Sequence, residues 1–241
     1  MKIYRLKEVL IGVNNGVITE NEALEEIKKA NPLELSIAEQ GLLEEGISPE
    51  ELKKFCKIHL KALEDKLQEI KSSLDRGHPI HTMISEHEEI LKFLDKLDNL
   101  IEPLKRGISD EEKMILQDLS EHLVDAEKHH EREEKVLFPE LERRGLTGPP
   151  RIMRLEHDEL RPIKKRLLEL SIEPDKNKNE IIELINVLSY KLRDHIFKEN
   201  NILYLAALNA IREDIIWENI RMECDRIGYC CFTPQFRMQY K

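Results

Sequence analysis

Helix starts and stops are unusually clear in this sequence, and they constrain the fold more than any other feature. The capping-box pattern, in which Ser or Thr precedes Glu by three residues, begins helices. It occurs at Thr19/Glu22, Ser48/Glu51, Ser85/Glu88 and Ser109/Glu112. Glycines that end helices stand at Gly46, Gly77, Gly107 and Gly145. Between these marks apolar residues recur at the helical period, as at Ile181, Leu184, Ile185 and Leu188, so we expect an all-α protein.

The same marks divide the chain into three parts. Residues 1–75 are expected to form a small helical domain, with short helices over about 20–30 and 34–45 and a longer one from Pro49. Residues 76–212 hold long helical segments over about 80–104, 110–144, 150–170 and 178–211, and short connections predict an antiparallel four-helix bundle. Residues 213–241 are expected to form a helix and an aromatic strap that pack on the bundle. We find no strand pattern and no internal repeat.

Composition excludes several classes of function. The net charge is −10, and Lys and Arg alternate with Asp and Glu, so the basic stripe of a nucleic-acid-binding protein is missing. No apolar segment is long enough for export or for crossing a membrane. We therefore expect a cytoplasmic protein that binds neither nucleic acid nor a membrane.

Two His-x-x-x-Glu pairs carry the chemistry: His129 with Glu133, and His195 with Glu199. A spacing of four places both side chains on one helix face, one turn apart. An imidazole and a carboxylate at this spacing can bind one metal ion, or the carboxylate can bridge to a second ion. His130 and Glu134 have the same spacing. We favour the His129/Glu133 register because Leu119, His122, Ala126, His129, Glu133 and Val136 form one stripe on a helical wheel.

The other two bundle segments each add one inward histidine, His87 and His157. Six polar groups in one bundle core would carry a large desolvation cost without a metal. Mixed imidazole and carboxylate ligands favour iron, with manganese or zinc as alternatives. We therefore predict two iron ions with carboxylate and oxo bridges, held by His87, His129, Glu133, His157, His195 and Glu199.

Other histidines and the cysteines are given lesser roles. We expect His78, which precedes Pro79, to be a turn residue, and His122 and His81 to support the metal ligands from a second shell. The spacing of Cys224, Cys230 and Cys231 matches no zinc pattern, so we expect them to be structural.

At these residues the chain resembles known families. Residues 78–212 resemble a hemerythrin HHE cation-binding domain, and residues 129–139 (HHEREEKVLFP) are close to that family's His-x-x-x-Glu-Glu-x-x-Leu-Phe-Pro pattern. The two His-x-x-x-Glu pairs are more similar to iron–sulfur repair di-iron proteins than to oxygen-carrying hemerythrins. Residues 39–48 (EQGLLEEGIS) and 55–59 (FCKIH) resemble the uncharacterised DUF438 family.

Two classes of function follow from these features. The first is a non-haem di-iron protein that binds or reacts with a small diatomic ligand or oxidant (O₂, NO or peroxide). The resemblance extends this to sensing, stress response or iron–sulfur repair. The second is a regulatory or scaffold protein whose metal is structural or sensory and whose residues 1–75 bind a protein partner.

Overall fold

The computed structural model describes residues 3–30, 38, 41–42, 45–47, 58, 61, 64 and 67–231. These residues form helices and connections without a β-strand, which confirms the all-α prediction. Predictions for the helix at 34–45, for the helix from Pro49 and for the cap at Ser48/Glu51 fall largely outside the described residues.

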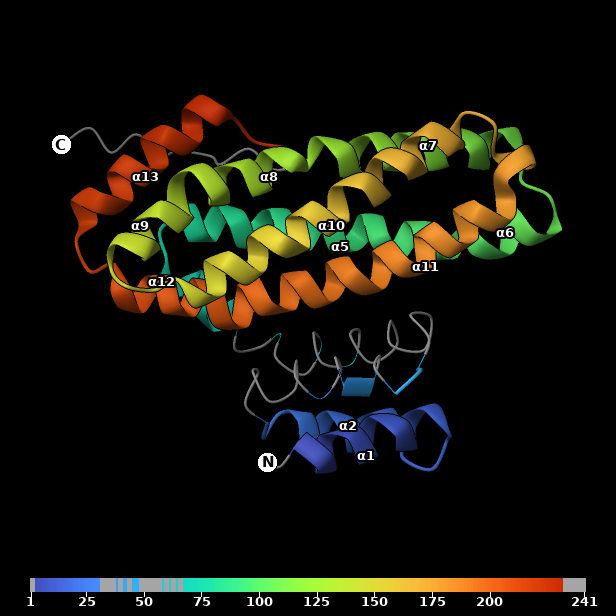
Figure 1. Ribbon diagram of the computed structural model, residues 1–241, viewed down its shortest axis with the longest axis horizontal. Helices are drawn as coiled ribbons and strands as arrows, with labels where there is room; N and C mark the ends of the chain where they lie inside the picture. The colour runs from blue at the N-terminus through green and yellow to red at the C-terminus, as the bar shows by residue number, and fades with distance from the viewer. Residues whose placement is uncertain are drawn as a thin grey trace.

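Four long helical rods form the bundle (Figure 1). The first rod consists of α5 (Pro79–Asn99) and α6 (Ile101–Arg106). The second consists of α7 (Asp110–Asp125), α8 (Glu127–Arg132), the π-helical turn η1 (Glu133–Leu137) and α9 (Phe138–Arg143). The third is α10 (Gly148–Ser171). The fourth consists of α11 (Pro174–Lys198), the π-helical turn η2 (Glu199–Leu203) and α12 (Tyr204–Ala210). Each rod matches one predicted segment to within four residues at either end.

Two of the predicted caps begin helices, and one does not. The capping box is complete at Ser109, where α7 begins, and at Thr19, where α2 (Glu20–Ile27) begins. The prediction at Ser85 is wrong: this residue lies inside α5, and its hydroxyl donates to the carbonyl of His81 at 2.8 Å. The helix begins earlier because His78 Nδ1 accepts the Ile80 N–H at 3.2 Å, as expected for a turn residue.

Apolar residues fill both ends of the bundle and leave a polar layer between them. Leu94, Leu116, Leu167 and Ile185 belong to the cluster at one end. Phe138, Tyr204 and Trp217 belong to the cluster at the other. Buried histidines and glutamates lie between these two clusters, so the rods hold them rigidly and away from water.

The N-terminal helices share an apolar cluster with the fourth rod. Helix α1 (Ile3–Asn14) was not predicted, because it lacks a capping box, although its buried Leu6, Val9 and Leu10 follow the helical spacing. Together with α2 it forms an apolar cluster that includes Tyr190 and Phe197 of α11. Residues on either side of His195 thus belong to the same apolar cluster as the N-terminal helices.

A last helix, α13 (Asp214–Ile227), lies along α8 in Figure 1. It ends at Gly228, whose φ of 95° is a left-handed conformation that glycine adopts at little cost. The chain then turns toward α5, and Cys230 and Cys231 pack against the bundle core. Residues 232–241 lie outside the described part. Among the described helices, none has the length and apolar character needed to cross a membrane.

Candidate metal centre

Both His-x-x-x-Glu pairs lie where an α-helix changes into a π-helical turn. His129 is in the last turn of α8 and Glu133 begins η1; His195 is in the last turn of α11 and Glu199 begins η2. Wider hydrogen bonds define these turns, because the Phe138 N–H donates to the Glu133 carbonyl and the Tyr204 N–H to that of Glu199. π-helical turns are rare and occur frequently at functional sites. The sequence did not predict them.

The structure brings all six predicted ligands together from the four rods. Each is at most 1% exposed: His87, His129, Glu133, His157, His195 and Glu199. They form two histidine pairs, with Nε2 atoms 3.1 Å apart in His87/His129 and 3.0 Å apart in His157/His195. We call the first pair the covered half and the second the open half, because of what surrounds them.

Two carboxylates join the halves. Glu199 places Oε2 3.1 Å from Nε2 of His87 and Oε1 2.8 Å from Nε2 of His195. Glu133 places Oε1 3.8 Å from Nε2 of His129 and Oε2 3.5 Å from Nε2 of His157. Each carboxylate therefore has one oxygen toward each half, which is the arrangement of a bridging ligand.

The outer nitrogen of every histidine in the cluster is occupied by an oxygen acceptor. His87 Nδ1 lies 2.8 Å from Oδ1 of Asn200, and His129 Nδ1 2.8 Å from Oε2 of Glu86. His157 Nδ1 lies 2.7 Å from Oε1 of Glu134, and His195 Nδ1 2.8 Å from Oε2 of Glu156. Since these oxygens accept, Nδ1 carries the proton in each neutral ring and the Nε2 lone pair points into the cluster.

This donor set fits metal ions. Two nitrogens bound to one ion at about 2.1 Å and a right angle lie about 3.0 Å apart, close to both Nε2 separations. Oε2 of Glu133 and both carboxylate oxygens of Glu199 are buried without a hydrogen-bond donor. Three groups are close enough to hold an ion each: Glu133, His157, His195 and Glu199; His87, His129 and Glu199; and His130, His157 and His195. A cation would satisfy lone pairs and carboxylates that are otherwise costly to bury.

In the absence of an ion, protons offset part of this charge. Burial lowers the pKa of His157, but the nearby carboxylates of Glu133, Glu134 and Glu199 outweigh it and raise the pKa to about 11. Burial likewise opposes ionisation of Glu199, yet His195, His157 and His87 hold its pKa well below the usual range. In the cluster the charge of the two bridging glutamates is therefore partly balanced by protons.

The residues of one half occupy positions that correspond to those of the other half, a repeat that the sequence analysis did not detect. Glu86 and His87 on α5 correspond to Glu156 and His157 on α10, since each glutamate holds the histidine of the other rod in its half. Glu133 and Glu134 of η1 correspond to Glu199 and Asn200 of η2. Arg132, which pairs with Glu86, corresponds to Lys198, which pairs with Glu156. The short Glu-His and His-x-x-x-Glu signals could have revealed the repeat.

One aromatic position breaks the repeat. Five residues after the bridging glutamate, η1 is followed by Phe138 and η2 by Tyr204. The Tyr204 hydroxyl donates to Oε1 of Glu133 at 2.9 Å and lies 3.1 Å from Nε2 of His129. Burial and the nearby Glu133 and Glu199 raise the pKa of Tyr204 well above its usual value, so it is a neutral phenol. Sequence analysis missed this residue.

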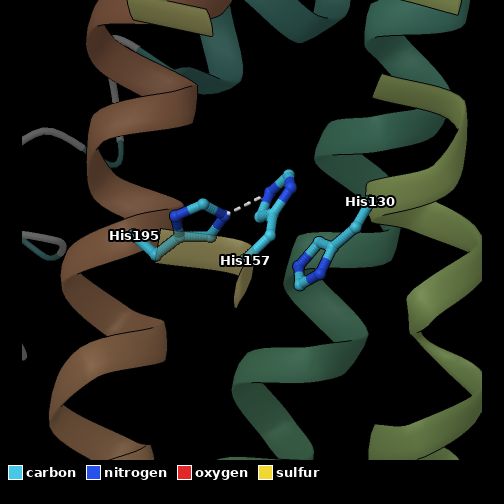
Figure 2. A group of neighbouring side chains, drawn as sticks. All are labelled: His130, His157 and His195. Atoms are coloured by element: carbon cyan, nitrogen blue, oxygen red, sulfur yellow. Dashed lines mark hydrogen bonds between the residues drawn. The ribbon is translucent and has the colours of Figure 1, made fainter. Parts of the chain in front are cut away.

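His130, the alternative to His129, lies beside the open half. Figure 2 shows His130, His157 and His195 together, and one ligand atom from each lies within 4.8 Å of the others. The His130 ring stacks on His157 with centroids 3.8 Å apart and planes inclined by 8°. Lone pairs of parallel rings lie in parallel planes, so these two rings in this arrangement cannot bind one ion together. We therefore keep His129, and not His130, in the proposed set of ligands.

Two histidines predicted to support the ligands are placed differently. His122 is exposed on α7, where it stacks on Phe93 and lies 3.6 Å from the Asp118 carboxylate. The helical-wheel argument was wrong here because the rod breaks at Ala126 between α7 and α8. His81 is half-buried and lines a surface cavity of about 430 Å³ with residues that include Lys71 and Arg76. The supporting groups are instead Glu86, Glu134, Glu156 and Asn200.

Comparison with known families agrees with this geometry. No curated protein matches the chain significantly. A family of unknown function (DUF438) matches residues 6–69, which include α2 and most of α1. The hemerythrin HHE cation-binding domain matches residues 78–207, more than half of the chain and all six residues of the cluster. The chain therefore belongs to the hemerythrin HHE cation-binding family.

Proposed function

We propose that this protein holds two iron ions in the bundle and uses them to bind or react with a small diatomic ligand or oxidant such as O₂, NO or peroxide. Two bridging carboxylates and four inward Nε2 lone pairs support the proposal most strongly. His87 and His129 would hold one ion, and His157 and His195 the other, with Glu133 and Glu199 between them. Ligand sets of nitrogen and carboxylate oxygen suit iron, while manganese and zinc are the alternatives.

Burial of the cluster favours a small ligand. All six side chains are at most 1% exposed, so a large organic substrate would have to displace the rods to reach them. When bound, a pair of iron ions supplies redox chemistry and coordination positions for a diatomic molecule. The Tyr204 hydroxyl and the Nδ1 acceptors orient the cluster and hold its protons.

Optical spectroscopy tests this proposal. Iron-loaded protein, reduced and kept anaerobic, is exposed separately to NO, O₂ and hydrogen peroxide. We expect a spectral change with at least one of them in the native chain and none after His129→Ala, which removes a proposed ligand. His122→Ala is the matched control, because His122 lies seven residues, about two helical turns, before His129 and is exposed. Iron-loaded native protein that responds to none of the three would contradict the proposal.

A regulatory role is the second candidate, and one contact favours it. The apolar cluster of α1 and α2 includes Tyr190 and Phe197, which lie on the helix that carries His195. Metal binding at His195 can therefore be transmitted along α11 to the apolar cluster that this helix shares with α1 and α2. Hydrogen exchange of residues 3–30 should slow when metal is loaded; exchange that is the same with and without metal would argue against this role.

A further inference from the structure

A pair of adjacent thiols touches the covered half from outside. Sγ of Cys230 lies 3.3 Å from Sγ of Cys231, and neither belongs to the six-residue cluster. The left-handed Gly228 that ends α13 turns the chain so that both residues face α5. Both are partly exposed, so small molecules from solvent can reach them.

The thiols are connected to the cluster through a single carboxylate. Oε1 of Glu86 accepts from both the N–H and the thiol of Cys230, each at 3.3 Å. Its other oxygen holds Nδ1 of His129 at 2.8 Å and pairs with Arg132. In the open half the corresponding Glu156 pairs with Lys198 and His195 and is partly exposed.

We propose that Cys230 and Cys231 form a redox-active dithiol that hydrogen peroxide oxidises to a disulfide, and that this disulfide alters the support of His129 through Glu86. The inference goes beyond the proposed function, because the thiol chemistry requires no metal ion.

Oxidation proceeds in two balanced steps. The Cys231 sulfur attacks one peroxide oxygen, the O–O bond breaks, and a sulfenic acid and one water form. The Cys230 thiol then attacks the sulfenic sulfur, an S–S bond forms, and the sulfenic hydroxyl leaves as a second water. The thiols lose two electrons and two hydrogens, and peroxide is reduced to water.

Local contacts assign the two roles. The Cys230 thiol donates its hydrogen to the buried Glu86 carboxylate, which disfavours the thiolate that would attack peroxide. The contact with Cys231 and burial also raise the pKa of Cys230. Cys231 is therefore the residue that reacts first, and Cys230 resolves the product. Neighbouring Cα atoms are about 3.8 Å apart, closer than in ordinary disulfides, so the bond is strained and easily reduced again.

Formation of the disulfide removes a hydrogen bond from Glu86. Cys230 then has no S–H to donate, and closing the small ring shifts its N–H. Because Glu86 orients His129, we expect metal affinity in the covered half to fall about tenfold, the size of effect seen when outer partners of metal ligands are disturbed.

Mass spectrometry of the full-length protein tests the inference, with and without metal. After peroxide treatment and alkylation, the peptide that holds both residues should have lost two hydrogens, and dithiothreitol should restore it. In Cys230→Ser, dimedone should trap a sulfenic acid on Cys231, while Cys231→Ser should leave Cys230 unmodified. Cys224→Ser is the control and should behave like the native chain, since Cys224 is buried in another cluster.

Three results would overturn the inference. The pair could stay reduced at peroxide concentrations that oxidise Cys231 in the Cys230→Ser variant. A disulfide to Cys56 or Cys224 could form in its place. The pair could also become oxidised only in metal-loaded protein, which would assign the chemistry to the metal centre. None of these readouts depends on a response to O₂ or NO, so the proposed function and this inference can fail separately.

Discussion

The two halves of the centre are built from corresponding residues, yet their surroundings differ. In the covered half Glu86 is fully buried beneath the chain that follows α13, and Asn200 is 2% exposed. In the open half the corresponding side chains, Glu156 and Glu134, are 22% and 24% exposed. A surface cavity of about 180 Å³ also reaches Glu156.

This difference indicates that buried protein groups alone orient the histidines of the covered half, whereas solvent can reach the corresponding groups of the open half. Removing a buried acceptor leaves its partner without a substitute, whereas water can replace an exposed one. The covered half, with Tyr204 and Arg132 around it, should therefore be the more rigid of the two. The open half should exchange protons and water more readily.

Removing a carboxylate shared by both halves should have the largest effect. Glu199→Gln takes away the charge that faces His87 and His195 together. We expect both ions to be lost, as measured by elemental analysis after desalting. Glu183→Gln, an exposed change on the same rod, should retain both. Retention of one ion by Glu199→Gln would mean that the halves do not share this ligand.

Neutralising the glutamates that accept from the histidine Nδ1 atoms should affect the two halves to different extents. Glu86→Gln should lower metal affinity about 10- to 100-fold, because it also leaves the buried Arg132 without its anion. Glu156→Gln should cost less than about tenfold, since solvent reaches that position. Competitive chelator titrations measure both affinities. Equal losses would remove the distinction between a covered and an open half.

Loss of the extra proton on His157 should lower the free energy of unfolding of the metal-free protein as pH rises. The pKa of His157 is about 11 when folded and near 6.5 when unfolded, so the folded state binds the extra proton. This stabilisation is complete below pH 6.5 and is lost as pH rises through about 11. Chemical unfolding between pH 7 and 10 should show falling stability in the native chain. His157→Gln should give a flatter profile; identical slopes would contradict the assignment.

The smallest effect is expected from Tyr204→Phe, which gives both π-helical turns a phenylalanine at the same position. Tyr204→Phe copies Phe138 into the fourth rod and removes the hydroxyl that donates to Glu133. A hydrogen bond to a carboxylate contributes about 1.5 kcal/mol or more, which is roughly tenfold in affinity. We expect unchanged metal content and a shift of that size in NO affinity, followed by optical titration. A variant that loses metal would make Tyr204 a ligand.

Sequence reasoning recovered what lies within single helices. Capping residues such as Ser109 located the rods, and the spacing of four identified His129/Glu133 and His195/Glu199. Partners that join different rods were missed, because Glu86 and His129 are 43 residues apart and meet only through packing. His122 shows the converse error, because the sequence placed it near the ligands and the structure leaves it exposed. Its predicted position failed because the rod is not one continuous α-helix.

Metal content per chain tests the central claim most directly. Protein purified without oxygen and loaded with ferrous iron is desalted and examined by elemental analysis, beside His129→Ala and His122→Ala. The account predicts two irons per chain in the native protein and in His122→Ala, with loss from His129→Ala. Native protein that is folded, contains no metal and cannot be loaded with iron, manganese or zinc would contradict it.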